Sequence, residues 1–226
     1  MLKAVIFDFD GVIADAEPVH MRAFQEVLYQ EGLSLSRDEY YDKYLALDDK
    51  TFFAAFLKDK NRRSDKKIIS ALMALKSEYF NRLIRESVIM FPGVKEFITN
   101  IGEIYSLAIG SGALRNEIEF ILDYAGIRDK FMAITSAEDV TNCKPDPEVF
   151  FTALHRINSL SSNDENIFPD ECLVVEDSIH GIKAAHSAGM KCLAVTNSYP
   201  AERLSQADMI VSSLEGIKTE DLERLF

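Results

Sequence analysis

Two aspartates follow the first strongly apolar run of the chain, and their spacing could support nucleophilic and acid–base chemistry. Residues 4–7 form this run, and Asp8 and Asp10 come directly after it, followed by Gly11. Side chains two residues apart on an extended chain point to the same face, so both carboxylates could meet one metal ion. One could act as nucleophile and the other as proton donor if their surroundings separate their pKa values. A solvated strand end with turn-forming Asp and Gly is the alternative.

A second pair of acids, Glu176 and Asp177, ends the apolar run 172–175. Carboxylates at the end of a buried strand are costly unless they meet a cation. With Asp8 and Asp10 they would place four acids at one edge of a sheet. Such a cluster needs a hard divalent ion, and Mg²⁺ with oxygen ligands fits best. The alternative is that these acids cap separate helices.

Ser111 and Gly112 could bind an anionic group. They follow the apolar run 107–109 and precede a helical pattern that begins near residue 114. A small hydroxyl and free backbone N–H groups ahead of a helix can hold phosphate oxygens. An ordinary turn between strand and helix is the alternative interpretation of this segment.

Lys144 stands in a short proline-rich segment that presents it ahead of a helix. Pro145 disfavours helical geometry at the residue before it, which places Lys144 in a loop. Asp146 is typical of an N-cap and Pro147 of the first helical position. A lysine held there could neutralise a phosphate and a nearby carboxylate, although most lysines are solvated surface residues.

The elements that must position these residues alternate between strand and helix. Continuous apolar runs predict parallel strands that are buried on both faces. Helical patterns lie between them, and this alternation predicts an α/β fold with a doubly wound, mostly parallel sheet and a Rossmann-like core. The predicted strands are 4–7, 107–109, 131–135, 172–175, 192–195 and 209–211, and the predicted helices are 93–102, 114–125, 146–157, 179–188 and 214–225.

One long stretch interrupts the alternation directly after the first strand. Residues 15–87 show only helical patterns, near 18–31, 37–45, 49–58 and 64–86. We therefore expect a small helical cap domain, 15–87, inserted into an α/β catalytic core of residues 1–14 and 88–226. Such an insert would stand over the carboxyl ends of the strands, where ligands bind in open α/β sheets. A decoration without functional role is the alternative. Phe52, Phe53 and Phe56 have helical spacing typical of core residues.

Composition limits the classes of partner. The 226 residues carry a formal net charge of −12, which repels nucleic-acid backbones and anionic membrane surfaces. The three cysteines form no CxxC pair, so a disulfide framework or zinc site is not expected. The amino terminus is typical of neither a signal nor a transit peptide, and no apolar run approaches membrane-spanning length. We expect a cytoplasmic protein, monomeric or a small homo-oligomer, that binds no nucleic acid or membrane.

In their order along the chain, these motifs resemble the haloacid dehalogenase-like hydrolase superfamily. The helical insert is similar to that family's small four-helix cap. The segment 15–24 resembles the branch that contains beta-phosphoglucomutase and small sugar-phosphate phosphatases. The matching segments are DFDGVIAD (8–15), IGSG (109–112), KPDPEVF (144–150) and VVEDSIHGIKAAHSAGM (174–190).

The resemblance implies a role for each acid. Asp8 would be the nucleophile and a magnesium ligand. Asp10 would be the general acid and base and would give its backbone carbonyl to the metal. Asp177 would ligate magnesium, with Glu176 close by, through water or directly.

The resemblance also implies which residues bind substrate. Ser111, Gly112 and Lys144 would hold the transferring phosphoryl group. In the cap, His20 and Lys50 could reach the rest of the substrate. A buried, satisfied helix histidine and a solvated helix lysine are the alternatives for these two.

The implied function is a magnesium-dependent phosphatase that hydrolyses a small phosphorylated metabolite, such as a sugar phosphate, through an aspartyl-phosphate. A phosphosugar mutase, in which a second substrate hydroxyl replaces water, is the alternative. The mutase resemblance would favour Thr where this chain has Ala16, and the segment 45–53 lacks the expected Gly-rich, Arg-containing sequence. Both departures weaken the mutase assignment more than the phosphatase one. A catalytically silent binding protein is a third possibility.

Overall fold

The computed structural model describes residues 1–45, 47–87, 90–161 and 165–226. The chain divides into two compact units. The α/β unit comprises Met1–Asp15 and Ile89–Phe226, and the helical unit comprises Ala16–Val88. No helix among the described residues is long and apolar enough to cross a bilayer.

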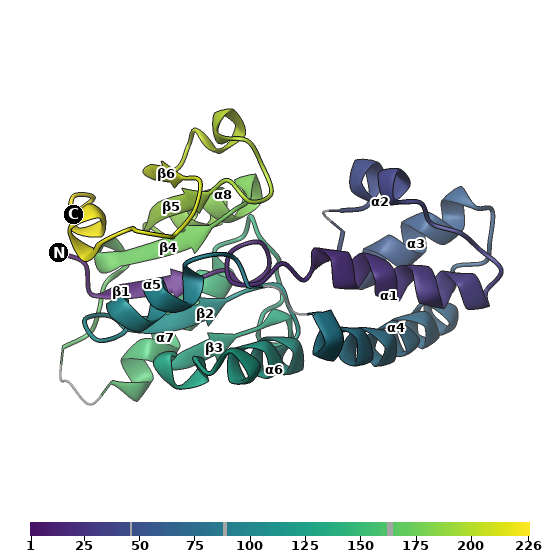
Figure 1. Cartoon of the computed structure of the whole chain (residues 1–226), viewed down its shortest axis with the longest axis horizontal. Coiled ribbons are helices and arrows are strands. Elements are labelled where there is room, and N and C mark those ends of the chain that lie inside the picture. Colours follow the sequence, from purple (N-terminus) through teal and green to yellow (C-terminus); the bar gives the residue numbers. More distant parts are fainter. Residues whose placement is uncertain (46, 88–89, 162–164) are drawn as a thin grey trace. The chain divides into compact units, whose positions relative to one another are not determined.

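The α/β unit is built on a six-stranded sheet in the order β3-β2-β1-β4-β5-β6 (Figure 1). Every neighbouring pair of strands is parallel, which confirms the doubly wound α/β class. The chain winds outward from β1 through β2 and β3, and then through β4, β5 and β6 on the other side. The strands are β1 (Ala4–Phe7), β2 (Ser106–Gly110), β3 (Ala133–Thr135), β4 (Cys172–Glu176), β5 (Lys191–Val195) and β6 (Met209–Val211).

The strand register brings the exits of the central strands to one level. Phe7 of β1 is paired with Ile109 of β2 and with Val175 of β4. The residues that follow these three strands therefore meet at the same edge of the sheet. This edge, at the switch point between the two halves of the winding, is where ligands bind in open α/β folds.

Helices cover both faces of the sheet. On one face, side chains of α7 and α8 pack with alternate residues of the strands, including Ile6, Ala108 and Val174. On the other face, Phe7 meets Phe97 of α5 edge to face, with ring centroids 6.1 Å apart. The helices of the unit are α5 (Val94–Ile101), α6 (Arg115–Ala125), α7 (Glu148–Leu160), α8 (Ile179–Ser187) and α9 (Thr219–Glu223), with short 3-10 turns at Arg128–Lys130, Ala137–Asp139, Pro169–Glu171 and Ala201–Leu204.

Several helix starts differ from the sequence predictions by one or two residues, and that of α9 differs by more. The helix predicted at 214–225 is shorter in the structure, where α9 spans Thr219–Glu223. It starts late because Gly216 has a left-handed φ of 77° and the Lys218 N–H donates to the Asp221 carboxylate. In α7, Pro147 is the N-cap and the helix begins at Glu148, one residue after Pro147, the predicted first helical position. Asp146 still receives a hydrogen bond from the Glu148 N–H at 3.0 Å. The strand predicted at 131–135 is limited to β3.

The helical unit consists, over its described residues, of α1 (Glu17–Gln30), α2 (Arg37–Lys43), α3 (Asp49–Asp59) and α4 (Lys66–Ser87). Ser36 and Asp48 cap α2 and α3 by accepting hydrogen bonds from backbone N–H groups. Phe52, Phe53 and Phe56 are fully buried, which confirms them as core residues.

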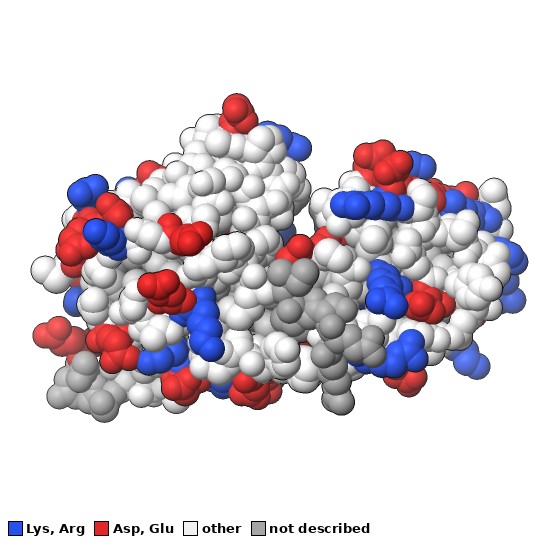
Figure 2. Space-filling view, in the orientation of Figure 1, with Lys and Arg blue, Asp and Glu red and all other residues white. Residues whose placement is uncertain are grey.

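The negative charge of the chain belongs to the α/β unit. The helical unit contains 13 Lys and Arg and 12 Asp and Glu, out of 25 and 37 in the whole chain, which leaves 12 and 25 for the α/β unit. On the face shown in Figure 2, acidic and basic side chains are interspersed rather than gathered by sign. An anionic substrate of the α/β unit would therefore need local cations in its binding site.

Candidate active site

Lys144 joins two buried carboxylates at the carboxyl edge of the sheet. Its Nζ lies 2.8 Å from Asp8 Oδ1 and 2.8 Å from Glu176 Oε1. Asp8 directly follows β1 and Glu176 is the last residue of β4, so adjacent strands supply the two acids. Glu176 is fully buried and Asp8 is 8% exposed. Lys144 also lies over the Phe150 ring, 4.8 Å from its centroid.

The pKa shifts of these groups follow from burial and mutual charge. Burial alone would lower the pKa of Lys144, but the charges of Asp8 and Glu176 outweigh burial and raise it. Burial raises the pKa of Asp8 in spite of the Lys144 charge. Burial also acts to raise the pKa of Glu176, but Lys144 and hydrogen bonds from Ser178 outweigh it and the pKa is lowered. The structure therefore favours a permanently charged lysine beside an ionised Glu176.

The second oxygen of Glu176 is fully engaged at the start of α8. Oε2 accepts hydrogen bonds from the backbone N–H groups of Asp177 and Ser178, both at 2.8 Å, and from Ser178 Oγ at 2.9 Å. Gly181 leaves room for this carboxylate, since a Cβ there would lie 1.7 Å from Glu176 Oε1. Glu176 thus holds Lys144 in a fixed position.

Three acids form a group that could hold a metal ion. Asp8, Glu176 and Asp177 each offer a carboxylate oxygen, and these oxygens lie within 4.8 Å of one another. Burial, followed by the charges of Glu176 and Asp8, raises the pKa of Asp177 well above its usual value. A divalent cation would relieve this repulsion, and hard oxygen donors suit Mg²⁺. The donor set therefore fits the expected ion.

Asp10 lies in a tight loop that returns the chain to the end of β1. Ile13 N–H donates to the Phe9 carbonyl at 2.8 Å, and Gly11 N–H donates to the Ala14 carbonyl at 3.1 Å. Gly11 has a φ of 79°, a conformation that favours glycine. The Asp10 carboxylate is not part of the three-acid group. The role that the resemblance gives Asp10 in metal binding is through its backbone carbonyl, and this role stays a prediction.

Ser111 and Gly112 stand at the end of β2, at the same edge. Ser111 is buried and donates its N–H to the Thr135 carbonyl at 3.0 Å. Its Oγ accepts a hydrogen bond from Ala113 N–H at 3.2 Å. Gly112 is exposed, and a Cβ there would have no atom within 4 Å. This open space beside a fixed hydroxyl can accept the oxygens of a bound group.

The two residues predicted in the cap have different surroundings within the helical unit. His20 Nδ1 lies 2.7 Å from Lys76 Nζ, and its ring stacks on Phe80 with centroids 4.2 Å apart. Lys76 is 1% exposed and pairs with Asp49 at 3.0 Å. Lys50, in contrast, is exposed in the first turn of α3. The structure thus assigns His20 a partner, Lys76, that sequence reasoning missed. A lysine one turn before Phe80 on an apolar helix face indicates a buried lysine, but it does not indicate which residue the lysine meets.

Lys76→Met should raise the pKa of His20 towards 6.5. Burial lowers the pKa of His20 most, and the Lys76 charge lowers it further. After the substitution only burial still lowers this pKa. Because the folded-state pKa lies below the unfolded one, the unfolded chain takes up a proton first as pH falls through 6.5, and the wild-type protein loses stability there. NMR titration of the His20 ring protons measures the shift. The exposed Lys67→Met, on the same helix, is the control, and an unchanged His20 titration in Lys76→Met would contradict the assignment.

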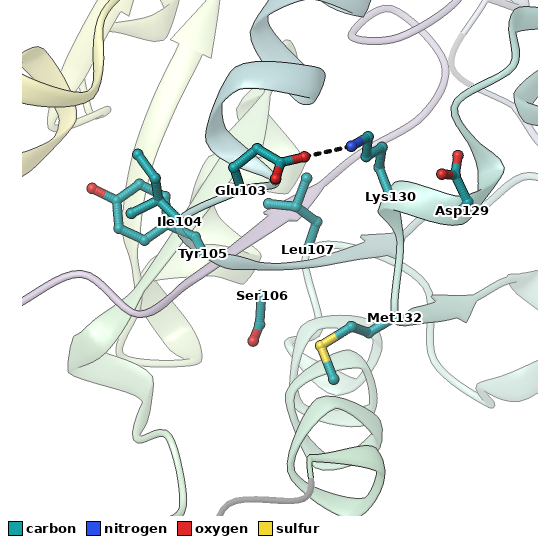
Figure 3. Close-up of a pocket in the computed structure, with 9 residues that line it drawn as sticks. Glu103, Ile104, Tyr105, Ser106, Leu107, Asp129, Lys130 and Met132 are labelled. Atoms are coloured by element: carbon teal, nitrogen blue, oxygen red, sulfur yellow. Dashed lines mark hydrogen bonds and ion pairs between the residues drawn. The ribbon is translucent and has the colours of Figure 1, made fainter.

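A cavity of about 390 Å³ lies away from the carboxyl edge of the sheet. It is lined by Ser106 and Leu107 at the amino end of β2 and by the Glu103–Lys130 ion pair at 2.6 Å (Figure 3). The acids and Lys144 follow the carboxyl ends of the strands. The cavity is therefore separate from the candidate active site.

Sequence reasoning also missed two residues that follow β5. Asn197 Nδ2 donates to the Gly11 carbonyl at 2.7 Å, and Ser198 Oγ donates to Asp177 Oδ2. The signal was present, because polar residues follow the apolar run 192–195 just as they follow the other strands.

Comparisons with known proteins show similarity to a phosphatase, to CbbY and to a mutase. The phosphorylated carbohydrates phosphatase of Thermotoga maritima is 27% identical to this chain over 84% of this chain and 83% of that protein. The crystal structure of CbbY from Rhodobacter sphaeroides in complex with phosphate has a TM-score of 0.83 at 25% identity and covers 96% of each chain. The beta-phosphoglucomutase from Clostridium difficile has a TM-score of 0.83 at 25% identity and covers 100% of this chain and 97% of that chain.

The family model described as haloacid dehalogenase-like hydrolase matches residues 5–195. This match includes β2 to β5, all of β1 but Ala4, and every residue of the candidate active site up to Asp177. It confirms the resemblance drawn from the sequence motifs. The chain therefore belongs to the haloacid dehalogenase-like hydrolase family.

Proposed function

We propose that this chain is a magnesium-dependent phosphatase that hydrolyses a small phosphorylated metabolite, of the sugar-phosphate class, through an aspartyl-phosphate on Asp8. The observation that carries the proposal is Lys144, held between Asp8 and Glu176 within a group of three buried acids. Phosphoryl transfer needs a nucleophile and groups that stabilise the negative charge of the transferring phosphoryl, and a largely buried cation beside a carboxylate and a set of hard oxygen donors can supply both. The phosphate named in the CbbY structure and the phosphorylated carbohydrates named for the Thermotoga maritima enzyme support this substrate class.

In the proposed reaction, an Asp8 oxygen attacks phosphorus while the bond from phosphorus to the leaving alcohol breaks. Asp10 donates a proton to the leaving oxygen. Asp10, now a base, accepts a proton from the water that attacks the aspartyl-phosphate, which releases phosphate and restores both acids. Lys144 orients Asp8 and offers positive charge to the phosphoryl oxygens, which Ser111 and Gly112 would also bind. Mg²⁺, held by Asp8, Asp177 and the Asp10 carbonyl, would supply further stabilisation of this charge.

We further propose that the helical unit is the cap domain and that it selects the substrate. Lys50 is exposed and therefore available to a substrate group distant from phosphorus. His20 is bonded to Lys76, so any contact it makes with substrate would involve the pair rather than the histidine alone.

A phosphosugar mutase is the second candidate, and the likeness to the beta-phosphoglucomutase structure favours it. In that reaction a second substrate hydroxyl would take the place of water. Ala16 and the sequence of the segment 45–53 favour the phosphatase. Isomerised product that depends on glucose 1,6-bisphosphate, with no release of phosphate, would decide for the mutase.

A phosphate-release screen over sugar phosphates, nucleotides and glycolytic acids, with Mg²⁺ present, tests the proposed function. We expect turnover of one or more sugar phosphates. Turnover confined to nucleotides would overturn the substrate class. No turnover of any phosphoester would instead favour a catalytically silent binding protein.

Removal of divalent metal should lower phosphatase activity at least about 100-fold, because Lys144 alone is then left to balance the charges of Asp8, Glu176 and Asp177 among the described residues of this group. The assay is hydrolysis of para-nitrophenyl phosphate by the protein after treatment with a chelator. Added Mg²⁺ should restore activity, which separates metal loss from irreversible damage. Full activity in the metal-free protein would exclude the metal role.

A further inference from the structure

The chain that leaves β5 runs past the candidate active site. Thr196 donates its N–H to the Val211 carbonyl at 3.0 Å, which continues the pairing with β6 and fixes the start of this segment. The next two residues, Asn197 and Ser198, turn their side chains toward the loop after β1 and the start of α8. The roles proposed above use neither residue.

Ser198 contacts the acid that would ligate the metal. Its Oγ donates a hydrogen bond to Asp177 Oδ2, across 21 residues of sequence. Asp177 is 5% exposed, so little solvent is available to satisfy its carboxylate. A carboxylate with one oxygen bound to a fixed hydroxyl cannot rotate freely, and the direction of its other oxygen is then set.

Gly11 packs against the same carboxylate, beside the oxygen that Ser198 contacts. A Cβ at Gly11 would lie 1.9 Å from Asp177 Oδ2 and 3.1 Å from Ser198 Oγ. The Gly11 carbonyl in turn accepts a hydrogen bond from Asn197 Nδ2 at 2.7 Å. The Asp177 carboxylate is therefore enclosed by the loop after β1 that contains Asp10 and Gly11, here called the Asp10 loop, and by the segment after β5. The Asn197 hydrogen bond joins these two segments.

We propose that Ser198 is a positioning residue that presets the Asp177 carboxylate for a divalent cation, with Asn197 holding the Asp10 loop against it. Neither residue touches the reacting atoms. Their contribution is to fix ligand orientation before the metal binds, and partners of this kind typically contribute 10–100-fold in metal affinity. The inference rests on the proposed function, because it assigns Asp177 to magnesium.

The test is titration of the full chain with Mg²⁺ alone, by calorimetry and without substrate. Ser198→Ala should weaken Mg²⁺ binding by about 10–100-fold, while activity at saturating Mg²⁺ returns most of the way to that of the wild type. Ser198→Thr keeps the hydroxyl and should bind Mg²⁺ nearly as the wild type does. Ser205→Ala removes an exposed hydroxyl a few residues further on and is the matched control.

Failure of the positioning role of Ser198 and failure of the magnesium site give different results. Wild-type affinity for Mg²⁺ in Ser198→Ala would overturn the positioning role and leave the proposed function intact. A wild-type chain that binds no Mg²⁺ would overturn the magnesium site and the inference with it. If Ser198→Ala does not fold by circular dichroism, Ser198→Cys, with its weaker donor, replaces it. Weakened Mg²⁺ binding by the thiol then supports the inference, and unchanged binding overturns it.

Discussion

Asp8→Asn should lower the turnover of phosphomonoesters by at least about 10⁴-fold, because an amide oxygen is a poor nucleophile. Glu176, the other carboxylate that pairs with Lys144, cannot replace it, since its second oxygen is bonded to the start of α8. The variant should also fail to capture BeF₃⁻, which mimics a phosphoryl group on an aspartate. Steady-state kinetics with para-nitrophenyl phosphate and fluorine NMR measure the two effects.

The control for this variant is Asp170→Asn, which makes the same change at an exposed aspartate and should leave turnover unaltered. Mass spectrometry of the Asp8→Asn protein excludes deamidation back to aspartate. Turnover within tenfold of the wild type in such a verified sample would remove Asp8 as the nucleophile.

Lys144→Met should destabilise the chain by about 3–5 kcal/mol at neutral pH, because it leaves the buried Asp8 and Glu176 carboxylates without their cation. It should also abolish turnover. Urea unfolding in the absence of metal measures the loss of stability. The exposed Lys183→Met on α8 is the control for removal of a lysine charge.

The pH dependence of this loss has a defined sign. Burial acts to raise the pKa of Glu176, but Lys144 outweighs burial and holds this pKa below its usual 4.5. The stabilisation it confers is therefore fully present above pH 4.5 and is lost as pH falls through the folded-state pKa. The difference in unfolding free energy between wild type and Lys144→Met should shrink below pH 4.5. Equal stability of Lys144→Met and Lys183→Met at pH 7 would contradict the buried ion-pair account.

The strands of the sheet were predictable because each lies on a short continuous apolar run, which is typical of a parallel strand buried on both faces. β1 and β6 have the predicted bounds, and β4 and β5 differ by one residue. The carboxyl ends of parallel strands meet at one edge, so Asp8, Glu176 and Asp177 could be grouped from sequence alone. Helix ends were less predictable, as α9 illustrates, because a single left-handed glycine such as Gly216 decides them.

Contacts that depend on tertiary packing could not be predicted. Ser198 meets Asp177 only because β4 and β5 are neighbours in register. The space that Gly181 leaves for Glu176 is a consequence of how α8 meets the end of β4. Lys76 is buried beside His20 because α1 and α4 pack together, a pairing that no local pattern specifies.

The central claim is that Asp8 carries the phosphoryl group. The most direct measurement is borohydride reduction of the protein quenched during turnover of para-nitrophenyl phosphate, since an acyl phosphate is reduced and converts its aspartate to homoserine. Mass spectrometry then locates the change. The account predicts homoserine at position 8 and an unchanged Asp10, with no modification in the absence of substrate. Homoserine at position 10, or no modification while turnover continues, would contradict it.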